Sequence, residues 1–180
     1  MQISDAVELI RSAIPGTGGT WADLGAGDGT FTRALLELLG TTARIYAVDR
    51  DAEALADLET WAAGRVADVI PVVADMTRPF DLPGLEGRLL DGMLLANALH
   101  FVPESKQVLA RLAPLVRPGG RVVIVEYDRS RASRWVPHPL PPARLPELAR
   151  SAGLSLPVLT ATRPSAFGGT LYAAAADRLA

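Results

Sequence analysis

The most informative segment of the chain is Trp21-Ala22-Asp23-Leu24-Gly25-Ala26-Gly27-Asp28-Gly29-Thr30. It begins with apolar residues, passes through three glycines at alternate positions, and leads into residues 31–39, where apolar side chains recur at helical spacing. This pattern predicts a buried strand, a tight turn and an amphipathic helix. Because glycine has no Cβ and a helix N-terminus carries unpaired N–H groups, such a turn can hold a ligand against its backbone.

A carboxylate follows the next expected strand. Asp49 stands 24 residues after Gly25, directly behind the apolar run of residues 43–48. From that position a carboxylate can accept hydrogen bonds from the two hydroxyls of a ribose. The glycine turn and Asp49 together predict an adenosine-containing ligand over the carboxyl ends of the strands.

Glycine spacing and charge separate two classes of such ligands. Dinucleotide sites use G-x-G-x-x-G, whereas Gly25, Gly27 and Gly29 give G-x-G-x-G. Asp23 would repel a pyrophosphate, but Asp23 and Asp28 suit a ligand that carries an ammonium and a sulfonium. The segment therefore favours S-adenosylmethionine over a nicotinamide dinucleotide.

The remaining chain alternates between helical and strand periodicity. Strands are expected over residues 20–24, 43–48, 69–74, 89–96 and 122–127, and helices over 3–14, 31–39, 55–62, 104–112 and 142–151. Residues 154–162 and 170–176 flank a turn at Phe167-Gly168-Gly169 and predict an antiparallel hairpin. Such alternation predicts one α/β domain, residues 1–180, with a doubly wound, mainly parallel sheet and helices on both faces.

Further motifs follow the glycine turn in a fixed order: Val48-Asp49-Arg50, Ala74-Asp75-Met76, Ala96-Asn97-Ala98-Leu99-His100 and Pro118-Gly119-Gly120. From about residue 20 to the end of the chain, this ordered set resembles the motif series of class I S-adenosylmethionine-dependent methyltransferases. The resemblance implies a Rossmann-like seven-stranded sheet in the order 3-2-1-4-5-7-6 with strand 7 antiparallel. That arrangement agrees with the expected terminal hairpin.

The resemblance also implies a role for each motif. Gly25 and Gly27 would contact the methionine part of the cofactor, Asp49 the ribose, Asp75 the adenine amino group, Met76 the adenine face and Asn97 the methionine end. With the neighbouring charged residues, the expected cofactor-binding set is Asp23, Gly25, Gly27, Asp28, Asp49, Arg50, Asp75, Met76 and Asn97. The alternatives are structural: Asp49 could begin a helix, Asp75 could be a turn acid, and Met76 could fill the core.

Three residues are candidates for catalysis. His100 follows the fourth expected strand and can exchange a proton near neutral pH, so it is the first candidate for a general base. Tyr127, beside Glu126 at the end of the fifth strand, and His138, in the following loop, are further candidates. Displacement at a sulfonium methyl mainly needs alignment and exclusion of water, so a base is optional and each side chain could instead be structural.

Residues 129–142 are rich in proline and arginine and are expected to form a loop near the same edge of the sheet. Residues 129–150 hold five arginines and one acid, Glu147, so the loop could recognise an anionic acceptor or could simply be a solvated surface. Since the first expected strand begins at Thr20, we expect no cap domain before it. This loop, a second copy of the chain or a partner subunit would then close the active site.

Composition excludes several classes of protein. The chain has 18 basic and 20 acidic residues, a net charge of −2 and no cysteine, which argues against a DNA-binding module, a thiolate metal site and a cysteine nucleophile. No cluster has the spacing of a metal site. No signal peptide or membrane span is evident, so we expect a cytoplasmic protein without a membrane partner.

The residue types present also exclude some kinds of methyltransferase. The segment Asn97-Ala98-Leu99-His100 lacks the Pro-Pro-aromatic run of enzymes that methylate base amino groups. Lys106 is the one lysine of the chain, which excludes the ribose methylases that need two lysines in a Lys-Asp-Lys-Glu set. The leading hypothesis is methyl transfer to an oxygen or nitrogen of a small organic acceptor. The alternatives are a protein or RNA methyltransferase, a non-catalytic cofactor-binding partner subunit and, less favoured by the glycine spacing, an NAD(P)-dependent oxidoreductase.

Overall fold

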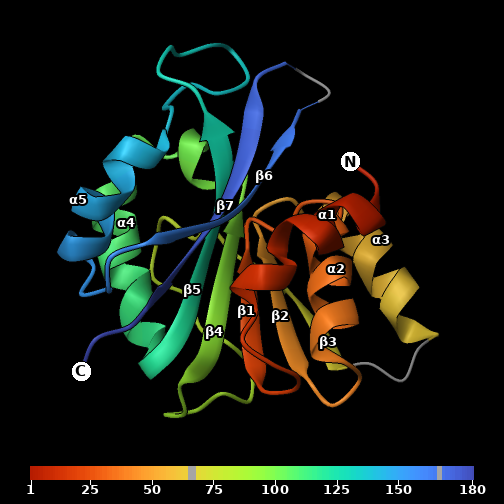
Figure 1. Ribbon diagram of the computed structural model, residues 1–180. Helices are drawn as coiled ribbons and strands as arrows, with labels where there is room; N and C mark the ends of the chain where they lie inside the picture. Colours follow the sequence, from red (N-terminus) through yellow and green to blue (C-terminus); the bar gives the residue numbers. More distant parts are fainter. Residues whose placement is uncertain (65–67, 166–167) are drawn as a thin grey trace.

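The computed structural model describes residues 1–64, 68–165 and 168–180. Within these residues the strands form one sheet in the order β3-β2-β1-β4-β5-β7-β6 (Figure 1). The strands are β1 (Thr20–Leu24), β2 (Arg44–Asp49), β3 (Asp68–Val73), β4 (Leu90–Ala96), β5 (Val116–Asp128), β6 (Val158–Pro164) and β7 (Thr170–Asp177). Strands β1 to β5 pair in parallel, and β7 runs antiparallel to both neighbours. The predicted fold class and strand order are confirmed.

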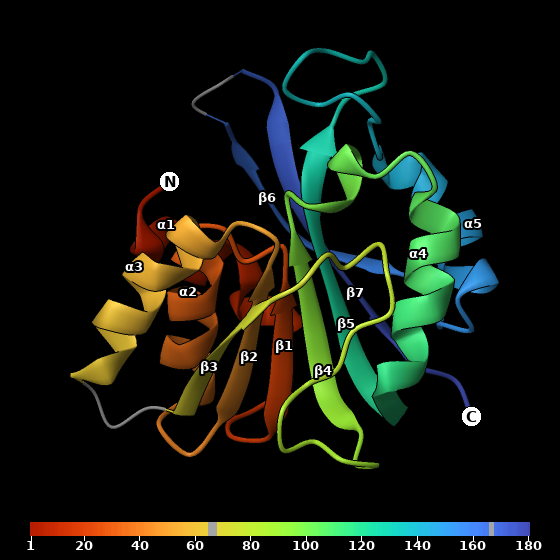
Figure 2. The same cartoon turned by 180° about the vertical axis from the view of Figure 1, so that it is seen from behind.

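Helices cover both faces of the sheet. The first face carries α1 (Ile3–Ile10), α2 (Thr30–Leu39) and α3 (Ala52–Ala63), and the second carries α4 (Ser105–Leu112) and α5 (Leu145–Ser151) (Figures 1 and 2). Side chains alternate along each strand, so Ile45 and Ala47 of β2 pack on the α1–α3 side while Tyr46 and Val48 pack on the other. This two-sided burial explains the continuous apolar runs of the parallel strands.

The connection between β3 and β4 replaces a helix on the second face. Residues 74–89 cross the back of the sheet as a loop (Figure 2) and bury Leu82 and Leu85 in the core. The Tyr46 hydroxyl donates a hydrogen bond of 2.8 Å to the Pro83 carbonyl oxygen and holds the loop down. A segment without regular structure can therefore close this side of the core.

Several predicted boundaries were wrong. The first helix ends at Ile10 and continues as a 3₁₀ turn, and β6 begins at Val158 rather than at residue 154. Leu154 instead forms an isolated bridge with Arg178. Strand β5 begins six residues earlier than expected, because Val116 already pairs with Leu90 of β4. The predicted turn residue Phe167 lies outside the described residues.

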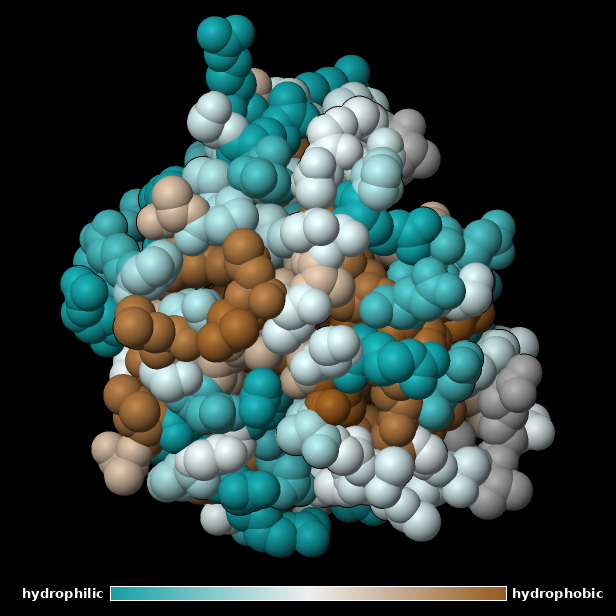
Figure 3. Space-filling view, viewed as in Figure 1, coloured by the Kyte–Doolittle hydropathy of each residue, from teal (hydrophilic) through white to brown (hydrophobic). Residues whose placement is uncertain are grey.

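Strand β6 forms one edge of the sheet. Leu156 and the first residues of this strand, Val158 and Leu159, are exposed apolar side chains. Figure 3 shows brown, apolar surface on the side of the molecule that β6 crosses. The opposite end of β6 lies beside α1, where the functional site begins.

Candidate active site

A cavity of about 630 Å³ lies at the carboxyl ends of the parallel strands. Four loops build its wall, one after each of β1, β2, β3 and β4. These loops contribute Gly25, Ala26, Gly27, Asp28, Asp49, Arg50, Asp51, Ala74, Asp75, Met76, Thr77, Asn97 and Ala98. Because the carboxyl ends of adjacent parallel strands meet at one edge, motifs far apart in the sequence converge here.

The glycine turn after β1 is tied to the end of β2. Backbone N–H groups of Gly25 and Ala26 both donate to the Val48 carbonyl oxygen, at 2.8 and 3.0 Å. Gly25 has φ +81°, and a Cβ there would lie 2.7 Å from the Cβ of Ala98. Gly27 has φ +52° and open space where its Cβ would be, so its bare backbone faces the cavity. The turn is therefore a cradle that side chains would fill.

Asp49 is fixed by two backbone donors. Its Oδ2 accepts a hydrogen bond from the Gly27 N–H at 2.8 Å, and its Oδ1 accepts one from the Asp51 N–H at 2.9 Å. The next helix is capped by Asp51, which accepts from Glu53 and Ala54, and not by Asp49. Each carboxylate oxygen can accept a further hydrogen bond, so Asp49 retains acceptor capacity for a hydroxyl group at the cavity wall.

Asp28 and Asp75 line the cavity and also stabilise their own turns. Oδ1 of Asp28 accepts hydrogen bonds from the backbone and hydroxyl of Thr30, at 3.0 and 2.8 Å. Oδ1 of Asp75 accepts from the backbone and hydroxyl of Thr77, at 2.8 and 2.6 Å. The bonds from Thr77 hold the pKa of Asp75 below its ordinary value. Asp75 therefore remains ionised beside the cavity.

Asp23 lies behind the turn and is absent from the described cavity lining. Its side chain is fully buried, and the Thr32 hydroxyl donates to its Oδ2 at 2.7 Å. Its Oδ1 has no hydrogen-bond partner among the described residues. Burial raises the pKa of Asp23 to about 7, and the nearby carboxylates of Asp49 and Asp28 add to the rise.

Asn97 presents an unpaired polar group at the end of β4. Its backbone adopts φ +53°, and its N–H donates to the Val125 carbonyl oxygen at 2.8 Å. Its side-chain Oδ1 is buried without a hydrogen-bond partner in the described part of the chain, although the residue lines the cavity. A ligand ammonium could satisfy this oxygen. The orphaned oxygen and the open glycine cradle therefore fit a cofactor with an amino-acid end.

The three catalytic candidates occupy different places. Tyr127 lines the cavity, whereas the described lining includes neither His100 nor His138. His100 is 2 % exposed, and its Nδ1 lies 2.6 Å from Oε2 of the fully buried Glu126. Its backbone N–H donates to Oε1 of Glu126 at 3.1 Å, and its carbonyl oxygen accepts from the His138 N–H at 3.0 Å. His100 and Glu126 thus form a buried pair beside the site.

The cavity extends beyond the loops to residues that sequence patterns did not single out. These residues are Asp5 of α1, Phe101, Arg163 of β6 and Leu171 of β7. Together with Tyr127 they form a second wall of the cavity, beyond the four loops. Arg163 Nη2 lies 2.9 Å from Asp5 Oδ1. None of these residues belongs to a local motif, and their proximity follows from the order of the strands, so the sequence carried no signal for them.

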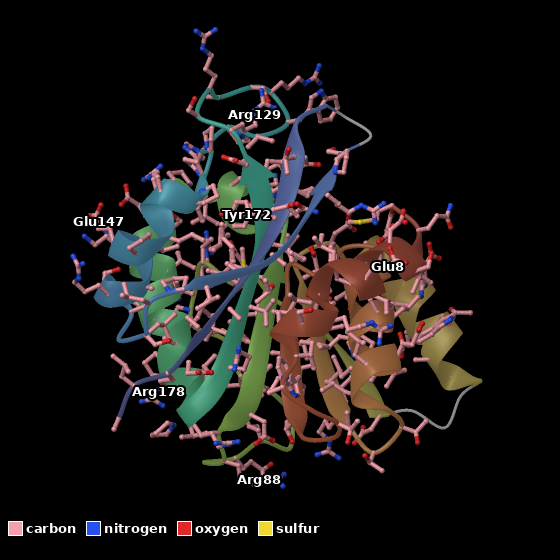
Figure 4. The ribbon with its side chains drawn as sticks, viewed as in Figure 1. Glu8, Arg88, Arg129, Glu147, Tyr172 and Arg178 are labelled. Carbon is pink, nitrogen blue, oxygen red and sulfur yellow. The ribbon has the colours of Figure 1, made fainter. Side chains whose placement is uncertain are left out.

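The arginine-rich loop does not form the cavity wall. No residue of 129–142, a segment that the structure describes throughout, lines the cavity. Figure 4 labels Arg129 on this loop beyond the end of β5, and the Arg129 Nε donates to the Arg131 carbonyl oxygen. The expectation that this loop forms part of the acceptor site is therefore not supported.

Within residues 1–64, 68–165 and 168–180, no group of three or more His, Asp or Glu side chains is arranged to hold a metal ion. Over the same residues, none of the helices has the length and apolar character needed to cross a membrane.

A doubly wound sheet with a glycine cradle and a fixed carboxylate at its carboxyl edge defines a Rossmann-like protein that binds an adenosine cofactor. The family model described as a methyltransferase domain matches residues 22–124, more than half of the chain. The chain therefore belongs to the methyltransferase domain family, within the class I S-adenosylmethionine-dependent methyltransferases, and S-adenosylmethionine is its cofactor.

Individual relatives agree with this assignment. The chain is 33 % identical over 90 residues to a ribosomal RNA small subunit methyltransferase H of Magnetococcus marinus, a match that spans 47 % of the chain and 29 % of the relative. It is 34 % identical over 106 residues to a demethylmenaquinone methyltransferase of Mycolicibacterium vanbaalenii, spanning 59 % of the chain and 41 % of the relative. The chain thus matches less than half the length of each of these relatives.

A solved structure extends the likeness over the whole chain. The 1,6-didemethyltoxoflavin-N1-methyltransferase of Burkholderia thailandensis, with bound 1,6-didemethyltoxoflavin and S-adenosylhomocysteine, superposes with a TM-score of 0.75. Sequence identity is 25 %, and the match covers 99 % of this chain and 78 % of that one.

Proposed function

We propose that this protein transfers a methyl group from S-adenosylmethionine to an oxygen or nitrogen atom of a small organic acceptor. One observation carries the proposal: a single cavity joins the glycine cradle to a second wall of Phe101, Tyr127 and Leu171. A cofactor and a small acceptor would meet in this space. Two of the similar proteins are named for menaquinone and toxoflavin chemistry, which supports a small-molecule acceptor.

The cofactor-binding roles follow the loops. Gly25 and Gly27 would hold the methionine part against bare backbone, and Asn97 would accept a hydrogen bond from its ammonium. Asp49 would bind the ribose hydroxyls, with Arg50 beside it. Asp75 would bind the adenine amino group and Met76 would pack on the adenine face. Asp28 and the buried Asp23 would add negative potential near the cationic cofactor.

When bound, S-adenosylmethionine supplies an electrophilic methyl group on a sulfonium. The protein's own task is then to exclude water and to align the acceptor atom. Phe101 and Leu171 provide apolar surface for the exclusion of water, and Tyr127 is the candidate catalytic side chain that lines the cavity. An amine or phenolate acceptor brings its own lone pair, so these residues can suffice.

His100 has a different proposed role. Because Nδ1 bonds Glu126, the ring could offer Nε2 alone to an acceptor proton. Because the ring is buried and contacts Phe101 and Tyr127, with centroids 4.2 and 5.8 Å away, we assign it first to positioning these two aromatic rings. His138, which bonds to the His100 backbone, would support the same turn.

RNA is the rival acceptor, because one relative is named as a ribosomal RNA methyltransferase. The net charge of −2 and the absence of arginines 129, 131 and 134 from the described cavity lining favour the small molecule. Closure of the site by a second copy or a partner subunit stays a proposal alongside it.

The test uses methyl-labelled S-adenosylmethionine with three acceptor pools: small metabolites below 1 kDa, total RNA, and protein. We expect label in the small-molecule pool together with release of S-adenosylhomocysteine. Label confined to RNA, and removed by ribonuclease, would replace the small acceptor with RNA. Cofactor binding without label in any pool would instead support the non-catalytic partner subunit.

A further inference from the structure

The wall of the cavity beyond the cofactor loops has a composition of its own. Tyr127 and Leu171 are register partners on β5 and β7, and Leu171 and Arg163 are register partners on β7 and β6. Directly opposed residues of antiparallel strands point to the same face of a sheet. The three side chains therefore form one row, about 10 Å long at the usual strand spacing, that lines the cavity on the α1 side.

The neighbouring row points away from the cavity. Glu126 and Tyr172 are register partners one position along, and both are buried on the α5 side of the sheet. The Tyr172 hydroxyl, labelled near the middle of the sheet in Figure 4, donates to the Leu140 carbonyl oxygen at 2.6 Å. Because side chains alternate along β5 and β7, Glu126 and Tyr172 pack in the core, whereas Tyr127 and Leu171 line the cavity.

Phe101 adds a further aromatic ring to the cavity wall. It lines the cavity yet is 58 % exposed, so most of its ring is not covered by the protein. It is nevertheless held in place, because the preceding His100 packs against it and is bound to Glu126 through both its ring and its backbone N–H. A preorganised, uncovered aromatic ring favours a flat apolar ligand at little entropic cost.

The far end of the row is polar. Arg163 and Asp5 form an ion pair there, with Nη2 and Oδ1 2.9 Å apart, and both residues line the cavity. A guanidinium has five N–H donors, so hydrogen-bonding capacity remains for a ligand oxygen. The wall therefore combines two aromatic rings and an aliphatic side chain with a donor at one end.

From this arrangement we propose that the acceptor is a planar aromatic molecule that packs against Phe101 and Tyr127 and directs a polar substituent to Arg163. The inference rests on the proposed function, because it names the class of acceptor for the same cavity. Aliphatic acceptors of the same polarity would contact the same wall with a poorer fit to the ring faces.

The first test compares flat aromatic ligands with saturated ring ligands that carry the same polar groups. Binding of phenol and cyclohexanol, and of 4-hydroxybenzamide and trans-4-hydroxycyclohexanecarboxamide, is measured by saturation-transfer NMR on protein saturated with S-adenosylhomocysteine. The aromatic member of each pair is expected to bind about five-fold tighter. Phe101→Ala should reduce this preference, because Tyr127 alone then presents an aromatic ring to the ligand. Trp135→Ala should retain it, because Trp135 is 74 % exposed and lies outside the described cavity lining.

Three results would overturn the proposal: equal binding of the two members of each pair, a preference that is undiminished in Phe101→Ala, or no binding of any probe at millimolar concentration. Retention of S-adenosylhomocysteine binding in those cases would show that the acceptor class failed and the cofactor site did not. Loss of S-adenosylhomocysteine binding by the wild-type protein would count against the proposed function itself.

The second test concerns the polar end. Arg163→Met should weaken binding of 4-hydroxybenzamide several-fold and leave phenol binding nearly unchanged, because the lost contact is to the amide oxygen. Arg129→Gln, on the loop outside the cavity, is the matched control and should change neither. Equal weakening of both probes in Arg163→Met would contradict a substituent-specific role.

Discussion

The surroundings of Asp23 differ from those of an ordinary surface acid. Its carboxyl group is completely buried, it has one donor in Thr32, and two further carboxylates lie near it. Burial disfavours the charged form, which raises the pKa to about 7. Asp23 can therefore gain or lose its charge near neutral pH, and a cationic ligand in the neighbouring cavity would favour the ionised form.

The shift at Asp23 predicts a pH dependence of stability. Since its pKa is raised from 3.8 to about 7 on folding, the folded state binds the proton more tightly. The associated stabilisation is fully present below about pH 4 and is lost as the pH rises to 7. Relative to wild type, Asp23→Asn should gain on the order of 3 kcal/mol between pH 4.5 and 7.5.

The measurement is urea unfolding of both proteins across that pH range, with Asp57→Asn as an exposed control acid on α3. A constant difference between wild type and Asp23→Asn over the whole range would show that Asp23 does not titrate there.

At the scale of the elements, the turn between β1 and α2 contains two glycines whose substitution should have different effects. Substitution of Gly25 should mainly affect folding, and substitution of Gly27 should mainly affect ligand binding. In Gly25→Ala the new Cβ would meet the Ala98 Cβ at 2.7 Å and the residue would keep φ +81°, so we expect a loss of at least about 2 kcal/mol of stability. In Gly27→Ala the Cβ would meet open space, and the cost of its positive φ should be about 1 kcal/mol.

Ligand binding should show the contrast more clearly. The Gly27 backbone faces the cavity, so Gly27→Ala should weaken S-adenosylhomocysteine binding more than ten-fold in titration calorimetry while the protein stays folded. Normal affinity in Gly27→Ala would mean that the cofactor does not lie against this turn.

The 3₁₀ turn Leu99–Phe101 and strand β5 are joined by the buried pair His100 and Glu126. Removal of one partner leaves the other buried and unsatisfied, so His100→Phe and Glu126→Gln should each destabilise the protein. In a double-mutant cycle of unfolding free energies, the two changes should couple by about 1–3 kcal/mol. Strictly additive changes would show that the contact does not join these elements.

At the level of the whole molecule, local sequence patterns predicted the kind of sheet, and the family resemblance implied its strand order. The alternation of apolar periods along the chain and the terminal hairpin correspond to the observed sheet, because each buried strand and amphipathic helix carries its own signal. Boundaries were less predictable where tertiary packing decides them. Val116 to Gly120 join β5 despite Pro118 and two glycines, which locally disfavour a strand.

The candidate site likewise contains residues that the sequence could place and residues that it could not. Gly27, Asp49 and Asn97 belong to motifs at strand ends, so the sequence could place them at one edge. Arg163 and Asp5 come from opposite ends of the chain and meet only because β6 lies beside α1. Sequence position also could not distinguish Tyr127, which lines the cavity, from Glu126, which faces the core, since that depends on the register of β5.

We expect the chain to bind S-adenosylmethionine through Asp49 and the glycine turn. Thermal unfolding with S-adenosylmethionine, S-adenosylhomocysteine and NADH in turn tests it most directly, on wild type, Asp49→Ala and the control Asp57→Ala. At about one hundred times its dissociation constant, a ligand stabilises by roughly 2.7 kcal/mol, or about 5–10 °C at this size. We expect this shift with the first two ligands only, its loss in Asp49→Ala and its retention in Asp57→Ala. A shift with NADH alone, or an undiminished shift in Asp49→Ala, would contradict it.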